Sequence, residues 1–168
     1  MKKRGRVKSG RNGVLLYLSV AAVALLLLAL GLATRAPSQP SGGMIPAGLS
    51  VYKTPQCGCC EEYVNYLKGL GVEVKVVTVS EEELSNLKTR LGIPAQLSSC
   101  HTSIVEGYFV EGHVPMEAII KLIKERPGVD GIALPGMPQG SPGMGGEKRG
   151  PFKIYAKRGD LIFVFTEI

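Results

Sequence analysis

The chain has 168 residues and a formal net charge of +6, but seven of its 20 Lys and Arg residues lie at or before Arg35. The other 13 are matched by 14 Asp and Glu residues, so the part after Arg35 carries a net charge of about −1. Such a nearly neutral domain lacks the strongly basic surface typical of nucleic-acid binding, and we expect no nucleic-acid partner.

The first segments of the chain predict a membrane anchor. Residues 1–13 form a basic tail, and residues 14–34 are uncharged and could span a bilayer core of roughly 30 Å as a helix. Because the positive charges precede the apolar run, we expect a single-pass protein of the cell membrane, with its C-terminal domain on the periplasmic or extracellular side. A cleaved signal peptide is the alternative, since small residues such as Ala29 and Ala36 would suit cleavage. Residues 35–48, rich in Pro, Gly and Ser, are predicted to be a flexible linker.

Residues 49–168 predict one α/β domain that begins with alternating strands and helices. The expected order is strand, helix, strand, helix, strand, strand and helix: Leu49–Lys53, Cys59–Leu70, Val72–Val79, Glu81–Leu91, Thr102–Val105, Tyr108–Glu111 and a helix that starts at Pro115. Ser80 and Glu83 form the pattern of a capping box at the start of the second helix. This order, with a cysteine motif between the first strand and the first helix, is typical of a thioredoxin-like domain.

The C-terminal part of the domain predicts an added loop and a β-hairpin. Gly131–Pro151 is rich in Gly and Pro and shows no regular element, and loops of about 20 residues in compact domains are usually functional or disordered. Residues 152–157 and 161–165 are expected to pair as the hairpin that closes the chain.

Three of the four cysteines, Cys57, Cys59 and Cys60, lie in one predicted turn, and the fourth is Cys100. Two structural disulfides are one interpretation, although a domain of this size does not need them and neighbours such as Cys59 and Cys60 rarely pair. A CxxC redox pair of Cys57 and Cys60 is a second, because a helix N-terminus lowers the pKa of a thiol. That interpretation offers no use for Cys59.

A soft-metal site is the third interpretation, because thiolates select Cu(I), zinc or iron–sulfur centres. The candidate metal ligands are all four cysteines, both histidines and two methionines of the Gly- and Pro-rich loop: Cys57, Cys59, Cys60, Cys100, His101, His113, Met137 and Met144. Thioether sulfur binds Cu(I) far more readily than zinc, so the methionines favour copper. Simpler roles stay open, since the histidines could bond to backbone groups and the methionines could fill gaps in packing.

Four sequence blocks resemble those of the CopG-like metal-binding family: CGCC at 57–60, LSSCHT at 97–102, GYFVEGHVP at 107–115 and PGMPQGSPGM at 135–144. The resemblance extends over about Leu49–Phe165. It implies a thioredoxin-like fold, Cu(I) bound by the CxCC thiols, and a role in controlling the redox state of copper or passing it between exported partners. Family members often have Trp three residues after the last CxCC cysteine, where this chain has Tyr63. We expect this departure to affect the packing behind the site more than its chemistry.

Together these patterns predict an exported, membrane-tethered Cu(I)-binding protein that takes part in copper detoxification or delivery. Its expected partners are copper ions, the membrane through residues 14–34, and an exported copper carrier or copper exporter. A thiol-disulfide oxidoreductase that uses Cys57 and Cys60 is the alternative, and a zinc or structural binding module is a third. The resemblance does not decide whether the protein catalyses a reaction.

Overall fold

The structure, a computed structural model, describes residues 48–168. The predictions for the basic tail, the membrane segment and all but the last residue of the linker lie outside the described residues. Among residues 48–168, none of the helices is both long enough and apolar enough to cross a membrane.

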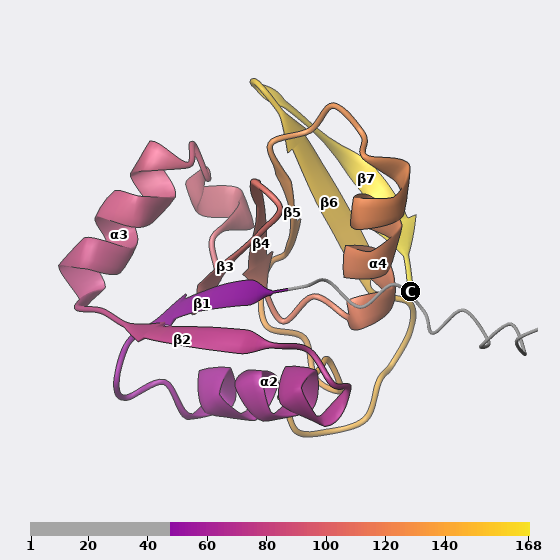
Figure 1. The fold of residues 1–168 in the computed structure, drawn as a ribbon. Coiled ribbons are helices and arrows are strands. Elements are labelled where there is room, and N and C mark those ends of the chain that lie inside the picture. Colours follow the sequence, from indigo (N-terminus) through magenta and orange to yellow (C-terminus); the bar gives the residue numbers. More distant parts are fainter. Residues whose placement is uncertain (1–47) are drawn as a thin grey trace, which may run out of the picture. The chain divides into compact units, whose positions relative to one another are not determined.

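Residues 48–168 form a mixed α/β fold around a seven-stranded sheet with the strand order β2-β1-β3-β4-β5-β6-β7 (Figure 1). The strands are β1 (Leu49–Lys53), β2 (Val74–Thr78), β3 (Thr102–Val105), β4 (Tyr108–Gly112), β5 (Gly131–Leu134), β6 (Lys153–Arg158) and β7 (Leu161–Glu167). The helices are α2 (Gly58–Gly69), α3 (Glu81–Arg90) and α4 (Met116–Glu125), with a short 3-10 helix η1 (Ala95–Leu97). Two pairs of neighbours, β1 with β2 and β4 with β5, are parallel, and the other pairs are antiparallel.

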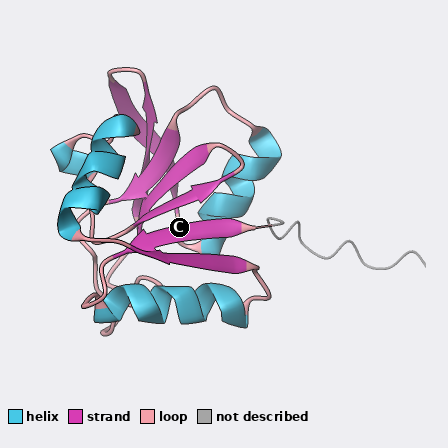
Figure 2. Cartoon of the chain, turned by 60° about the vertical axis from the view of Figure 1, so that its left-hand side comes forward, coloured by secondary structure: helices cyan, strands magenta, loops and turns pink. Residues whose placement is uncertain are grey.

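Helices cover both faces of the sheet (Figure 2). The larger core joins α2 and α4 to one face, with Val64 and Ile119 packed in the same cluster as Val110 of β4. The smaller core includes Leu97 of η1 and Phe109 of β4. Because successive side chains of a strand point to opposite faces, Val110 and Phe109 belong to different cores. Glu111 therefore points to the same side as Phe109, towards η1 and α3.

The expected element order is confirmed as far as α4. The capping box is present, since the backbone N–H of Glu83 donates to Ser80 Oγ at 3.2 Å and the N–H of Ser80 donates to Glu83 Oε2 at 2.8 Å. The end of α4 also has a local cause: its C-cap Arg126 adopts a left-handed conformation, with φ 43°, and Pro127 follows.

The prediction that Gly131–Pro151 contains no regular element is wrong at its start. Gly131–Leu134 forms β5, a fully buried strand between β4 and β6. Gly131 is required there, because a Cβ at this position would collide with the ring of Phe109. The predicted hairpin of β6 and β7 is present, but β5 makes it part of the same continuous sheet.

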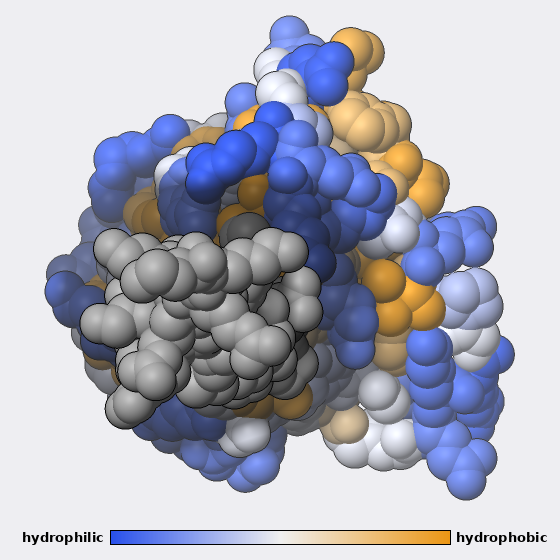
Figure 3. All heavy atoms as spheres, turned by 45° about the vertical axis from the view of Figure 1, so that its right-hand side comes forward, coloured by the Kyte–Doolittle hydropathy of each residue, from blue (hydrophilic) through white to orange (hydrophobic). Residues whose placement is uncertain are grey.

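The surface of the outer strand β7 is partly apolar. Leu161, Phe163 and Val164 have exposed fractions of 67%, 40% and 49%. Figure 3, which turns the right-hand side of Figure 1 forward, shows apolar atoms in orange beside hydrophilic ones on this side of the molecule. In the sheet order, β7 lies three strands away from β4, so this surface is separate from the cysteine cluster.

Candidate metal site

The turn between β1 and α2 carries the three clustered cysteines. Cys57 is the N-cap residue of α2, and Cys59 and Cys60 lie in its first turn. Cys57 and Cys60 form a disulfide, with Cα atoms 5.3 Å apart, whereas Cys59 and Cys100 are free thiols. The interpretation as two structural disulfides is therefore wrong for this structure. The structure shows the form of the protein in which Cys57 and Cys60 are oxidised.

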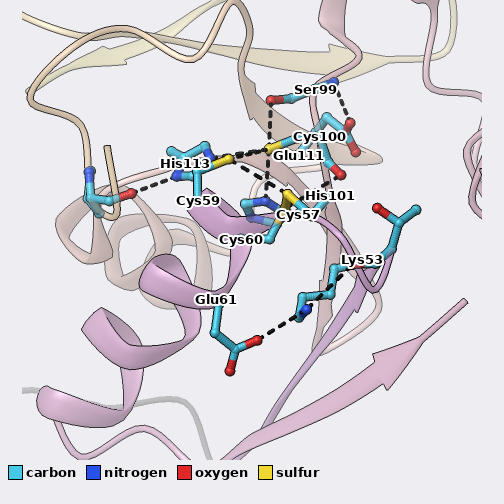
Figure 4. The surroundings of a disulfide bond; sticks show 12 residues. Lys53, Cys57, Cys59, Cys60, Glu61, Ser99, Cys100, His101, Glu111 and His113 are labelled. Atoms are coloured by element: carbon cyan, nitrogen blue, oxygen red, sulfur yellow. Dashed lines mark hydrogen bonds and ion pairs between the residues drawn. A yellow bond between two sulfur atoms is a disulfide. The ribbon is translucent and has the colours of Figure 1, made fainter. Parts of the chain in front are cut away.

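Cys100 joins this cluster because of the strand pairing. It lies in the loop between η1 and β3, and β3 runs antiparallel to β1, with Thr102 opposite Tyr52. The residues just before β3 therefore lie beside those just after β1. The Sγ atoms of Cys57 and Cys59 are 3.6 Å apart, and those of Cys59 and Cys100 are 3.9 Å apart (Figure 4). All four sulfur atoms lie within 4.8 Å of one another.

Both histidines of the chain face the same sulfur atom. Cys100 Sγ lies 3.4 Å from His101 Nδ1 and 3.2 Å from His113 Nε2. His113 Nδ1 lies 2.7 Å from the carbonyl oxygen of Pro142, which can only accept, so the proton of the neutral ring belongs on Nδ1. The lone pair on His113 Nε2 consequently points to Cys100. A backbone carbonyl that orients an imidazole in this way is typical of metal-binding histidines.

The donor set fits a soft metal ion. His101 is fully buried with its Nδ1 towards Cys100 Sγ, whereas its Nε2, on the other side of the ring, has no hydrogen-bond partner within residues 48–168. Four sulfurs and two imidazoles converge, and such ligands favour Cu(I) or zinc over hard cations such as calcium. The cysteines and histidines predicted from the sequence are thus brought together, while their role as ligands stays a prediction.

Tyr63 fills the space behind the two imidazoles. Its ring centroid lies 4.6 Å from that of His101 and 5.4 Å from that of His113, and its hydroxyl donates to the carbonyl oxygen of Val114 at 2.8 Å. Burial raises the pKa of Tyr63 well above its ordinary value of 10.0. Tyr63 is therefore a neutral packing partner of both rings. It occupies the position where family members often have Trp, and for which we expected a change in packing.

Burial keeps the Cys100 thiol and the two imidazoles uncharged. Burial and the neighbouring Cys59 raise the pKa of Cys100 to about 12. Burial, His113 and Lys88 lower the pKa of His101 to about 3, and burial also lowers the pKa of His113. Neutral imidazoles are ready to act as ligands, whereas the thiol of Cys100 must lose its proton when a metal binds.

We expect the low pKa of His101 to make the metal-free protein sensitive to acid. In the unfolded chain His101 takes up a proton near pH 6.5, whereas in the folded chain it does so only near pH 3. The free energy of unfolding should therefore fall as the pH decreases from about 6.5 towards 3. Thermal unfolding across this range measures the effect, and a His101→Gln variant should show a flatter dependence. An equally steep dependence in the variant would contradict this assignment.

The β5–β6 loop (residues 135–152) lies against the start of α2. A Cβ on Gly143 would lie 2.9 Å from Tyr63 Cα and 3.0 Å from the carbonyl oxygen of Cys59, so the loop backbone touches the helix. Adjacent Cα atoms are about 3.8 Å apart, which places the backbone of half-buried Met144 close to the first turns of α2. Met137 has an exposed fraction of 40%, so more of its side chain faces solvent.

Gly143→Ala is expected to displace this loop. Gly143 has φ +77°, which disfavours any side chain, and its Cβ would collide with α2. We predict a loss of about 1–3 kcal/mol in the free energy of unfolding and a weaker metal affinity, because His113 would lose its contact with Pro142. Gly145→Ala is the matched control, since a Cβ there has no atom within 4 Å. Equal unfolding temperatures for the two variants would contradict the prediction.

Sequence reasoning missed two residues behind Cys100. Glu111 of β4 accepts hydrogen bonds from Lys88 Nζ, from the N–H of Ser99 and from Thr102 Oγ1. A Lys in the last turn of a helix and a Glu in a strand carry no local signal of such a pairing. The sequence predicts Glu111 only as the last residue of a strand, and it gives the side chain no specific role.

A cavity of about 450 Å³ opens beside the cluster. Cys57 and Cys100 line it, together with Lys88 and Ser99. Cys57 is half-buried, whereas Cys60 is fully buried. The cavity therefore gives a ligand or a partner group access to Cys57 and Cys100 rather than to Cys60.

Comparisons with known proteins identify the family of the chain. A family model described as "Protein of unknown function, DUF411" matches residues 97–144, which include Cys100, both histidines and both loop methionines. Two solved structures, "Copper resistance protein copG- Form 1" and "Copper resistance protein copG- Form 2", are each 38% identical to the chain, with a TM-score of 0.66. Each match extends over 73% of this chain and 98% of the other. A search of curated proteins found no match. The chain therefore belongs to the family of the copper resistance protein copG.

Proposed function

We propose that this protein binds Cu(I) as its cargo and takes part in copper detoxification or delivery. The observation that carries the proposal is the convergence on Cys100, whose sulfur lies 3.9 Å from Cys59 Sγ and within 3.4 Å of a nitrogen of each histidine. Thiolate and imidazole together suit Cu(I) and zinc. The name of the two similar structures favours copper, and so does Met144, a thioether residue whose neighbour Gly143 touches α2.

The Cys57–Cys60 disulfide makes copper binding dependent on the redox state of these two cysteines. Two of the four sulfurs are joined to each other in the described state, so they are not thiolates. A thiol reductant would supply two electrons, cleave the bond and restore both thiols. Since metal binding requires thiolates, we infer that the reduced protein is the copper-binding form and that oxidation opposes binding.

We also propose that the protein works outside the cytoplasm. The basic residues 1–13 and the apolar residues 14–34 support a single-pass anchor, with residues 35–48 as a linker and residues 49–168 as the outward-facing metal-binding domain. The order β1, α2, β2 with a CxCC motif at the start of α2 supports a thioredoxin-like assignment. An exported copper carrier or a copper exporter would then be the natural protein partner.

An anaerobic Cu(I) titration tests the binding proposal. The full-length protein, solubilised in detergent and fully reduced, is titrated in the presence of a chromophoric Cu(I) chelator, and we expect it to withdraw copper from the chelator. A variant with Cys57, Cys59 and Cys60 all replaced by Ser should not compete. Equal copper affinity of the two proteins would refute the proposal, and a preference for zinc in parallel titrations would favour a zinc module.

Thiol-disulfide exchange is the second candidate function. It is favoured by the position of Cys57, which is half-buried, disulfide-bonded to buried Cys60 and lines the cavity. An incoming thiolate would attack Cys57 Sγ, and Cys60 would leave as the thiolate. Reduction of glutathione disulfide or insulin by the reduced protein measures this activity. A Cys59→Ser variant separates the functions, since weaker copper binding with unchanged reductase activity would favour the copper role.

A further inference from the structure

We propose that Glu111, together with Lys88, is a positioning group that fixes Cys100 and His101 in the orientation needed for metal binding. This inference rests on the proposed function, because it assigns these residues a role in the same site. Neither residue belongs to the candidate ligand set, although Lys88 lines the cavity beside Cys57 and Cys100.

The carboxylate of Glu111 holds both ends of the segment that carries the two ligands. Its Oε1 accepts from the backbone N–H of Ser99 at 2.6 Å, and its Oε2 accepts from Thr102 Oγ1 at 2.6 Å. Ser99 and Thr102 are the immediate neighbours of the Cys100–His101 pair. One rigid group on β4 thus bonds to the residue before Cys100 and to the residue after His101.

Lys88 of α3 completes this arrangement from the other side. Its ammonium donates to Glu111 Oε1, to the carbonyl oxygen of Ser99 and, at 3.2 Å, to Ser98 Oγ. Both polar groups of the Ser99 backbone are therefore bonded to one ion pair. The side chain of Glu111 is 0% exposed and that of Lys88 12%, so water competes little for these bonds.

The backbone of β4 fixes the same loop independently. The N–H of Gly112 donates to the carbonyl oxygen of His101 at 3.1 Å. A Cβ on Gly112 would lie 2.7 Å from Ser99 Oγ, so the loop packs directly against the strand. Glu111 and Gly112 are consecutive, and together they set the distance between the Cys100 loop and the sheet.

The burial of this ion pair points to positioning rather than to stability alone. Removing two charges from water is unfavourable, and a buried ion pair often stabilises a fold no more than apolar residues of the same volume would. Here the pair forms hydrogen bonds to Ser99, and the next residue is Cys100. Cys100 is a candidate ligand that belongs both to the four-sulfur group and to the group with His101 and His113. Groups that hydrogen-bond the ligands of a metal, when removed, typically weaken metal affinity by about 10–100-fold, and we expect a loss in the same range for Glu111, which bonds the residues on both sides of the two ligands.

The test uses three variants of the full-length protein. Glu111→Ala removes the acceptor. Lys88→Met combined with Glu111→Gln removes both charges and the bonds of Lys88 to Ser98 and Ser99, but it keeps one side-chain oxygen that can accept from the Ser99 N–H, while the amide NH2 can donate to Thr102 Oγ1. Asp130→Ala is the matched control, because Asp130 also accepts from a lysine, Lys157 Nζ at 2.7 Å, and from a backbone N–H, that of Gly159 at 3.1 Å, at the β6–β7 turn.

The first measurement needs no copper. In the metal-free protein with its Cys57–Cys60 disulfide intact, iodoacetamide labels the two free thiols, and mass spectrometry gives the rate at Cys100 relative to Cys59. Glu111→Ala should raise this ratio about tenfold, since a lost buried hydrogen-bond acceptor frees the loop. The ratio should rise by only about threefold in the double variant, which loses the Lys88 bonds to Ser98 and Ser99 but keeps an acceptor for the Ser99 N–H, and it should stay within about twofold of wild type in Asp130→Ala.

The second measurement is the Cu(I) affinity of the reduced proteins, which should fall about 10–100-fold in Glu111→Ala, fall less in the double variant and stay near wild type in Asp130→Ala. A wild-type protein that fails to bind Cu(I) would end the proposed function, while the labelling ratio would still decide the positioning role. An unchanged labelling ratio in Glu111→Ala, or the same rise in Asp130→Ala, would overturn the inference. If Glu111→Ala does not fold, Thr102→Val is measured instead, because it removes one of the two bonds to Glu111. Its labelling ratio should rise about threefold. A ratio equal to that of the wild type would overturn the inference.

Discussion

Replacing Cys100 with serine is expected to lower the Cu(I) affinity of the reduced protein by about 100-fold or more. Cys100 belongs to both groups of converging donors, the four sulfurs and the set with His101 and His113. Structural zinc sites with four ligands are stabilised by roughly 10–16 kcal/mol, so the loss of one ligand is expected to cost about 3 kcal/mol, which corresponds to roughly 100-fold. Competition with a chromophoric chelator measures the change.

Cys59→Ser provides a graded comparison for this variant. It removes a sulfur from the four-sulfur group but leaves Cys100, His101 and His113 in place, so its affinity should fall less than that of Cys100→Ser. Thermal unfolding of both metal-free variants checks that the fold is retained. A Cys100→Ser variant that binds Cu(I) within twofold of wild type would show that the converging donors are not the binding site.

Oxidation of the reduced protein is expected to have a still larger effect. Formation of the Cys57–Cys60 disulfide removes two thiolates at once, and the same estimate per ligand gives a decrease of about 10⁴-fold in Cu(I) affinity. The measurement compares reduced protein with protein oxidised by diamide, after mass spectrometry has shown which thiols are joined. We expect bound copper to be released on oxidation.

A double variant with Cys57 and Cys60 replaced by Ser is the matched control for the oxidation experiment. It lacks the same two thiolates but cannot form the disulfide, so its Cu(I) affinity should equal that of the oxidised wild type whether or not diamide is added. Tight copper binding by the oxidised wild type would contradict the inference that only the reduced protein binds copper tightly. A response of the double variant to diamide would place the redox chemistry at Cys59 and Cys100 instead.

The elements that the sequence predicted well are those with local signals. β1 alternates over Leu49–Lys53, and α3 starts at a capping box. β5 was missed because its four residues, Gly131–Leu134, lie within a Gly- and Pro-rich segment and are all buried, so they show no alternation. Its strand character depends on β4 and β6, which lie far from it in the sequence.

The same distinction explains what could be predicted of the site. The clustering of Cys57, Cys59 and Cys60 is visible in the sequence, and the donor chemistry of Cys100 and the histidines made them candidates. Their convergence required the antiparallel pairing of β1 with β3. The Lys88–Glu111 pair could not be predicted, because it joins a helix to a strand 23 residues later and becomes specific only when both are buried.

X-ray absorption at the copper edge of the reduced, Cu(I)-loaded protein tests the central claim most directly. The account predicts that sulfur dominates the copper coordination, with a smaller nitrogen contribution from imidazole that decreases in a variant with both His101 and His113 replaced. A spectrum with nitrogen and oxygen neighbours but no sulfur would contradict it, because the thiols at the start of α2 and Cys100 would then not be the ligands.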